Sequence, residues 1–378
     1  MSKSKFTFPV GYHDFHEDQV FNFQLNRWYS FGYARFEDMR KVGRKIENFA
    51  DWKRELTKLA EKSVSEKRLM NAAFYYRAAE FYTFEGDPDK EPLYDKFSDL
   101  FYRAFKKDEI KRFKVPYKKT FLPAMKVTPA SGRAKGTIVM FGGFDSYIEE
   151  FYSWMRCFAD RGYRVIAFEG PGQGAARKKY GLALDYRWEK PTKAVLDYFK
   201  LDNVTLLGIS MGGWFCFRAA AFEPRIKRVM ASGIAFDYMQ IPAVPLQWLM
   251  KLCLKSEGLM NYLSEMKIRK DPAHTWSVHN AMYITKTKTP MGAMKTLLQL
   301  NEKNLHSELV KQDVLILTGA EDHFIPLKMH DMQVKALVNA KSVTGRIFTE
   351  KDQAQNHCQI GNVGLALDVM LKWLAEKS

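Results

Sequence analysis

The pattern of apolar and polar positions divides the chain into three regions with different periodicities. In the first region, residues 19–108, apolar residues recur at the spacing of one helical face. The expected helices cover 21–35, 35–62, 65–84 and 92–105. We therefore predict an N-terminal helical domain over residues 1–109.

From about residue 110 the pattern changes to short apolar strands that alternate with helices. The expected strands are 110–117, 120–127, 137–141, 164–168, 204–209, 228–234, 314–318 and 345–348. The expected helices are 150–161, 188–199, 212–222, 327–337 and 363–375. Short, continuously apolar strands separated by helices indicate an α/β fold, with a mostly parallel sheet and helices on both faces.

Residues 237–303 interrupt this alternation with a segment rich in methionine and aromatic residues. Such a segment is either additional helical core or a lid over the ends of the strands. Methionine-rich surfaces suit adaptable apolar pockets, which favours an inserted helical lid. The sheet domain is then expected in two parts, residues 110–236 and 304–378.

Composition limits the class of protein. The chain has 378 residues, 46% of them hydrophobic, which is enough for a large core with an accessory domain. The formal net charge of +16 raises the question of nucleic acid, but the basic residues are dispersed and no zinc-finger or RNA-binding signature occurs. We expect a lysine-rich surface and no nucleic-acid partner.

The cysteines and the N-terminus bear on location. The four cysteines are scattered and form no CxxC pair, which is typical of a reducing cytoplasm. No signal-peptide pattern begins the sequence, and no stretch of about 18 apolar residues occurs, so no membrane span or membrane partner is predicted. No HExxH or similar spacing is present, so neither a metal nor a cofactor is expected.

The sharpest chemical signal is GISMGG, residues 208–213, between an apolar strand and a helix. A serine hydroxyl is a weak nucleophile and needs a base beside it. A tight strand-to-helix turn would expose Ser210 at the sheet edge, and it crowds the positions two residues away, which are Gly208 and Gly212 here. This GxSxG arrangement predicts a nucleophile elbow.

A nucleophile of this kind needs backbone N–H groups for the negative oxygen that forms during attack. The residue after the serine, Met211, would supply one N–H, and an earlier loop the other. Gly142 and Gly143 directly follow the strand 137–141. We predict an oxyanion hole from Met211 with either Gly143 or Phe144.

The acid that orients the base is expected on a loop after a late strand, between the serine and the histidine in chain order. Asp322 follows the strand 314–318 and fits this position. Glu321 and Asp237 are the competitors.

The base is expected after the last strand. Of the eight histidines only His357 lies there, in NHCQIGN. His323 lies beside Asp322 but on the wrong loop, and Cys358 has no second base to activate it. The glycine-rich loop 169–174 lacks a P-loop ending, so we interpret it as a rigid loop near the mouth of the site.

The chain resembles α/β-hydrolase-fold enzymes, in particular the dihydroxy-pseudo-oxynicotine hydrolase family. The segments that carry this resemblance are GGFDSYIEEFY (142–152), FEGPGQG (168–174), GISMGG (208–213) and NHCQIGN (356–362). Fungal polyketide-shortening hydrolases and FrsA-like esterases are similar. The resemblance implies a Ser210–Asp322–His357 triad, cleavage of an ester or of a C–C bond next to a carbonyl, and a homodimer. An accessory acid in that family has Asp237 as its nearest candidate here, without a motif match.

These residues lead to three functional hypotheses. The first is a serine hydrolase that acts on a small, largely apolar carbonyl compound. A peptidase or thioesterase on the same scaffold is the second. The third is a binding or regulatory protein that has lost turnover, although a complete triad in the expected order argues against it.

Overall fold

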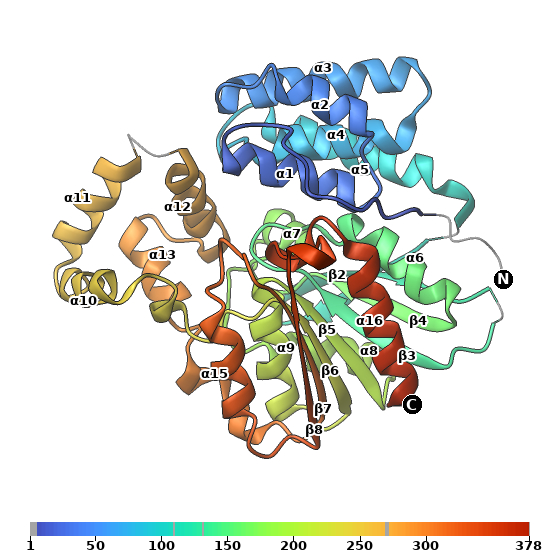
Figure 1. The fold of residues 1–378 in the computed structure, drawn as a ribbon, viewed down its shortest axis with the longest axis vertical. Helices are drawn as coiled ribbons and strands as arrows, with labels where there is room; N and C mark the ends of the chain where they lie inside the picture. Colours follow the sequence, from blue (N-terminus) through green and yellow to red (C-terminus); the bar gives the residue numbers. More distant parts are fainter. Residues whose placement is uncertain (1–5, 109, 131, 269–271, 378) are drawn as a thin grey trace.

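The computed structural model describes residues 6–108, 110–130, 132–268 and 272–377. Its centre is an eight-stranded sheet with the order β1-β2-β4-β3-β5-β6-β7-β8 (Figure 1). The strands are β1 Lys111–Tyr117, β2 Thr120–Val127, β3 Gly136–Phe141, β4 Tyr163–Phe168, β5 Val204–Ile209, β6 Ile226–Ser232, β7 Asp313–Gly319 and β8 Ser342–Phe348.

The direction of the strands brings several loops together. β1 is antiparallel to β2, and β2 is antiparallel to β4. The strands from β4 to β8 in the sheet order are parallel to one another. The carboxyl ends of β3, β5, β6 and β7 therefore open onto the same edge, the usual place for a ligand site in α/β sheets.

Alternate strand residues enter two separate cores. Ile138 and Met140 of β3 pack on the side of α6 (Tyr152–Asp160) and α16 (Val363–Glu376). Val139 and Phe141 pack on the side of α8 (Glu189–Tyr198), α9 (Met211–Phe222) and α15 (Lys328–Ala336). Both faces of the sheet are covered, which confirms the predicted α/β layers.

The N-terminal helices lie over one end of the sheet (Figure 1). They are α1 Gln19–Ser30, α2 Phe36–Gly43, α3 Phe49–Ser65, α4 Leu69–Phe81 and α5 Lys90–Ala104. Their apolar residues belong to the same core as α6 and α16. The predicted domain end, residue 109, lies outside the described residues.

The prediction of a single helix over 35–62 is wrong, because the structure has two. α2 ends at Gly43, where a side-chain Cβ would come within 2.1 Å of the Phe15 carbonyl oxygen. α3 restarts after Asn48, whose side chain accepts the Asp51 N–H as an N-cap. The helical spacing of apolar residues continues across the break between α2 and α3, because both helices bury their apolar faces in the same core.

The inserted segment is helical, as expected. It contains α10 Val244–Cys253, α11 Glu257–Ile268, α12 Pro272–Thr285, α13 Pro290–Leu297 and α14 Glu302–Leu305. In Figure 1, α10 and α11 form the edge of the molecule away from the sheet. Within the described residues, no helix is both long and apolar enough to cross a membrane.

Short elements and strand ends differ most from expectation. α7 (Gly174–Lys178) was not predicted, and neither were the 3₁₀ turns Lys106–Asp108, Ile148–Phe151, Tyr238–Gln240, Ser307–Leu309, Glu350–Asp352 and His357–Gln359. β8 begins at residue 342 rather than 345. It is an edge strand with mostly exposed residues, so its first half lacks an apolar pattern.

Candidate active site

The turn between β5 and α9 holds Ser210 in a backbone conformation that side chains rarely adopt, with φ 59° and ψ −126°. Its N–H donates to the Ser232 carbonyl at 2.8 Å. Glycine is needed around it: a Cβ at Gly208 would lie 2.0 Å from the Gly212 carbonyl oxygen, and one at Gly213 would lie 1.9 Å from that of Gly233. The strain places the hydroxyl at the carboxyl edge of the sheet.

Three side chains far apart in sequence meet at this edge. His357 Nε2 lies 2.9 Å from Ser210 Oγ, and His357 Nδ1 lies 2.6 Å from Asp322 Oδ2. The other carboxylate oxygen of Asp322 accepts the N–H groups of Phe324 and Ile325, each at 2.9 Å. The loops after β5, β7 and β8 thus join in one chain of hydrogen bonds.

The charges within this chain stabilise each other. Burial alone would raise the pKa of the Asp322 carboxyl, but the positive charge and hydrogen bond of His357 hold it below its usual value. Burial alone would lower the pKa of the His357 imidazole, but the Asp322 carboxylate holds it well above its usual value. Each of the two groups therefore stabilises the charged form of the other.

The loop that carries His357 is fixed from two sides. Cys358 and Gln359 both have positive φ, and the Gln359 side chain accepts the Ser232 hydroxyl at 2.8 Å. Gly361 receives the N-terminal region, because its N–H donates to Ser30 Oγ at 3.0 Å and its carbonyl accepts the Gly11 N–H at 2.7 Å. Sequence reasoning did not identify Gln359 as part of this support.

The loop after β3 lies directly against the serine turn. A Cβ at Gly143 would be 2.8 Å from the Met211 nitrogen and 2.9 Å from Ser210 Cβ. Glycine at this position leaves the space in front of the Met211 N–H open. The structure therefore brings Met211, Gly143 and the adjoining Phe144 to the side of Ser210 where an oxyanion would form.

Two flanking groups hold this loop. Gln173 Nε2 donates to the carbonyl oxygens of Gly142 at 2.6 Å and Gly143 at 3.3 Å. Glu169 accepts the Ile148 N–H at 3.1 Å, on the far side of the loop. The glycine-rich loop 169–174, interpreted from the sequence as rigid, is thus a support for the loop after β3.

The Ser210 hydroxyl faces a cavity of about 670 Å³. Phe23 of α1 and Phe31, the residue directly after α1, line one part of it, and residues of the inserted helices line another, among them Met250, Met260 and Leu263. Charged groups are few, and Arg27 and Asp145 are two of them. A cavity of this size with mainly apolar walls suits a small, largely apolar molecule.

Comparison with known proteins gives the family. Residues 136–344, more than half of the chain, match the family described as alpha/beta hydrolase fold. This chain belongs to the α/β-hydrolase family.

Relatives of this α/β hydrolase are named as hydrolases. It is 27% identical over 350 residues to hydrolase acrC of Aspergillus aculeatus, covering 82% of this chain and 80% of the relative. It is 30% identical over 281 residues to 20-hydroxy-prefusarin hydrolase FUS2 of Gibberella moniliformis, covering 68% and 66%. The crystal structure of 2,6-dihydroxy-pseudo-oxynicotine hydrolase is similar with a TM-score of 0.67 at 22% identity, covering 92% and 94%, which shows a shared fold.

An ion-pair network in this α/β hydrolase links the N-terminal helices to the loop after β3. Arg27 of α1 pairs with Asp145 at 3.0 Å and with Glu150 at 2.6 Å. Arg77 of α4 pairs with Glu150 at 2.8 Å and Glu80 at 2.6 Å, and it donates to the Asp145 carbonyl. No sequence motif indicated this network, because Arg27 and Arg77 lie more than 60 residues before the loop in the sequence.

The remaining candidates do not belong to the hydrogen-bonded chain of Ser210, His357 and Asp322. The Asp237 carboxylate accepts the Met239 N–H at 2.8 Å and caps a 3₁₀ turn, and Asp237 does not line the cavity. Its accessory role remains a prediction. Glu321 is exposed, and His323 packs against the rings of Phe23 and Phe324. The Cys358 thiol donates to the backbone carbonyl of Ser232 at 3.4 Å.

Proposed function

We propose that this α/β hydrolase is a serine hydrolase that cleaves an ester, or a C–C bond next to a carbonyl, in a small and largely apolar substrate. The observation that carries the proposal is the hydrogen-bonded chain Ser210–His357–Asp322, which opens into an apolar cavity beside the Met211 N–H. A serine, a base and an orienting acid in this order are the parts that nucleophilic acyl transfer requires.

In the first half-reaction His357 Nε2 takes the Ser210 proton while Oγ attacks the substrate carbonyl carbon. The carbonyl electron pair becomes an oxyanion next to the N–H of Met211 and that of Gly143 or Phe144. When the intermediate collapses, the bond to the leaving group breaks and His357 donates the proton to that group. An ester loses an alcohol, and a C–C substrate loses a carbanion that a neighbouring carbonyl or phenol stabilises.

In the second half-reaction water attacks the acyl group on Ser210 and gives its proton to His357. Collapse of this intermediate releases the carboxylic acid and restores the serine. Throughout, Asp322 accepts the Nδ1–H of His357, which fixes the tautomer and stabilises the imidazolium without taking up the proton.

A fluorophosphonate probe and an activity screen test the proposal. The wild type should label at Ser210 and hydrolyse 4-nitrophenyl esters or a 1,3-diketone, whereas Ser210→Ala should do neither. Ser63→Ala, which changes a buried serine of α3 that does not line the cavity, is the control for labelling specificity. Labelling that persists in Ser210→Ala would contradict the assignment of the nucleophile.

The same screen separates the other hypotheses. Preference for acyl-CoA or aminoacyl amides would instead indicate a thioesterase or a peptidase. A folded wild type that neither labels nor turns over any of these compounds would indicate the binding or regulatory protein. A cytoplasmic location and a homodimer remain predictions from the sequence.

A further inference from the structure

The outer face of the inserted helices α10 and α11 is apolar and exposed. On α10, Val244, Trp248 and Leu252 follow one another at four-residue spacing and are 60%, 73% and 61% exposed. On α11, Leu259 and Tyr262 are 45% and 60% exposed. Because residues three or four apart lie on one side of a helix, the three α10 side chains form one apolar strip, and Leu259 and Tyr262 form a second on α11.

The opposite face of the same two helices is also apolar. Leu249 and Met250 of α10 and Met260 of α11 line the cavity in front of Ser210. A surface helix normally has one apolar side, which it buries, so a second apolar side that is exposed is unusual. An exposed apolar patch of this kind, with a tryptophan at its centre, marks a surface that another body covers.

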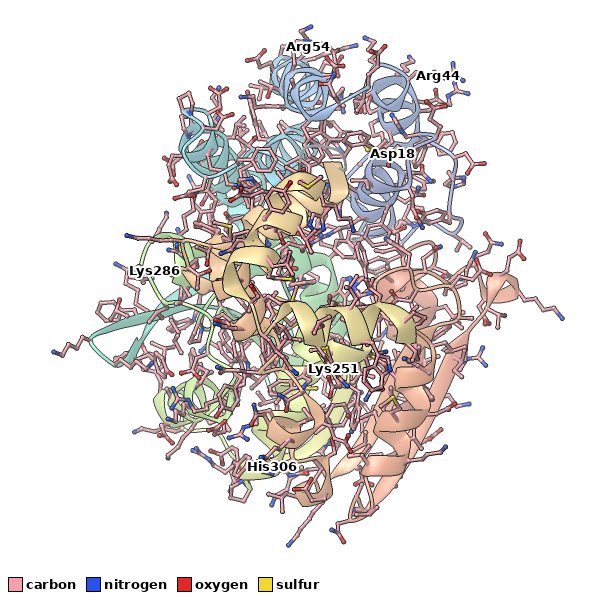
Figure 2. All side chains as sticks on the ribbon, turned by 90° about the vertical axis from the view of Figure 1, so that its left-hand side faces the viewer. Asp18, Arg44, Arg54, Lys251, Lys286 and His306 are labelled. Carbon is pink, nitrogen blue, oxygen red and sulfur yellow. The ribbon has the colours of Figure 1, made fainter. Side chains whose placement is uncertain are left out.

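The charges around the patch indicate what that body is. Residues 244–256 contain two lysines, Lys251 and Lys255, and no acidic residue, whereas α11 adds Glu257, Glu265 and Lys267, so the basic character lies on the α10 side of the face. Lys251 lies on the α10 side that faces the viewer in Figure 2, with its ammonium 5.7 Å from the Trp248 ring centroid. The chain as a whole carries a formal charge of +16. Tryptophan and leucine flanked by lysine are what an anionic lipid interface attracts.

A second copy of the chain fits the same patch less well. A two-fold contact pairs a patch with itself. Helices packed through the Trp248 face would bring Lys251 of one copy toward Lys251 of the other, and like charges repel. An anionic surface neutralises these lysines instead.

We propose that the outer face of α10 and α11 docks on an anionic phospholipid surface. The two helices lie in the plane of the interface, with Trp248 and Leu252 among the acyl chains and the lysines at the phosphates. Leu246 and Leu249 are both half exposed and line the cavity, so the docked face adjoins the site. The proposal goes beyond the proposed function, and it departs from the sequence-based prediction of no membrane partner, which rested on the lack of a span.

Vesicle sedimentation tests the proposal with the full chain. Wild type should pellet with vesicles of phosphatidylcholine mixed with phosphatidylglycerol, and far less with phosphatidylcholine alone. The double variant Trp248→Gln/Leu252→Gln should partition at least about tenfold more weakly, because two large side chains no longer enter the acyl region. Lys251→Glu/Lys255→Glu should also lose about tenfold or more, because each lysine favours an anionic surface.

Matched controls separate docking from damage to the fold. Val338 is 72% exposed, much like Trp248, and lies after α15, so Val338→Gln should bind vesicles like the wild type. Neither Trp248 nor Leu252 lines the cavity, so their variant should keep the wild-type circular dichroism and its rate on a soluble 4-nitrophenyl ester.

Three outcomes would overturn the proposal. The first is wild type that stays in solution with both vesicle types. The second is unchanged pelleting of Trp248→Gln/Leu252→Gln. The third is a wild-type dimer that this variant converts to a monomer in light scattering, which would assign the patch to a second copy. Loss of hydrolysis in Ser210→Ala has no bearing on vesicle binding, so the two proposals fail separately.

Discussion

Two helical regions cover the cavity of this α/β hydrolase, and they are attached in different ways. The N-terminal helices share one continuous core with the sheet and send Arg27 and Arg77 into buried ion pairs with the loop after β3. The inserted helices α10 and α11 line the cavity with aliphatic and methionine side chains and keep a large part of their apolar surface exposed. The first region holds the reacting groups in place, whereas the second shapes the space for the substrate.

The largest expected effect comes from changing Asp322, the acid of the proposed triad. Asp322→Asn should lower kcat by about four orders of magnitude, because His357 loses the group that fixes its tautomer. It should also shift the acidic limb of kcat/KM to lower pH. In the wild type His357 must lose a proton whose pKa the Asp322 carboxylate raises, so activity rises only well above the ordinary histidine value.

The same pair gives a pH-dependent stability. The raised pKa of His357 contributes stability that is complete below its unfolded value, about 6.5, and is lost as pH rises through the folded value. The lowered pKa of Asp322 contributes above about 3.9 and is lost as pH falls. In urea denaturation, the free energy of unfolding of the wild type should include this contribution between about pH 3.9 and pH 6.5. The free energy of unfolding of Asp322→Asn should lack it. An unchanged pH profile of kcat/KM in that variant would contradict the coupling.

The next effect tests the attachment of the N-terminal helices. Arg77→Met should reduce the free energy of unfolding by up to about 3–5 kcal/mol, because the buried Glu80 and Glu150 each lose one of their two cationic partners and keep only Lys90 and Arg27. Arg40→Met is the control, since the Arg40–Glu37 pair is half exposed and worth at most about 1 kcal/mol. Equal losses in the two variants, measured by urea denaturation, would show that the network does not attach the helices.

A smaller effect is expected at the loop after β3, which we propose to supply an oxyanion donor. Gln173→Met removes the side-chain N–H that donates to the Gly142 carbonyl. We expect kcat to fall by about tenfold with KM nearly unchanged. This loss is smaller than the roughly 100- to 1,000-fold fall in kcat that follows removal of an oxyanion donor itself, because the donor is only misplaced. Gln312→Met is the matched control, because its amide donates to the Ala220 carbonyl at 2.9 Å away from the cavity. A rise in KM with kcat unchanged would argue against a positioning role.

The smallest change in stability is expected in the inserted helices. Leu263→Ala should alter the free energy of unfolding by less than about 1 kcal/mol, since the side chain is 39% exposed. It should nevertheless change the ratio of kcat/KM for long-chain and short-chain esters by up to about tenfold, because it removes cavity wall. Leu196→Ala, in the buried core, should show the reverse pattern. Equal ester ratios in Leu263→Ala and wild type would remove the inserted helices from substrate selection.

The sequence predicted the parts of the site that depend on local pattern. GISMGG sits between a strand and a helix, and His357 follows the last strand, so the order of elements alone indicated where both side chains lie. Supports built from distant segments left no such pattern. Gln173 holds a loop some 30 residues earlier, and Arg77 reaches Glu150 from another helical layer. The exposure of the outer face of α10 was not predicted either, because periodicity cannot distinguish a helix that is apolar on two sides from one that is fully buried.

Helix α12 links the two covering regions to the loop after β3. The Trp276 indole donates to the Phe81 carbonyl at 2.9 Å, and one turn later the Asn280 amide donates to the Phe144 carbonyl at 3.0 Å. Since both bonds come from one helix that also lines the cavity, a displacement of α12 would change the cavity wall and both bonds together. Admission of a bulkier compound and support of the oxyanion donors therefore trade against each other, and a variant selected for broader substrate scope at α12 carries a cost in turnover.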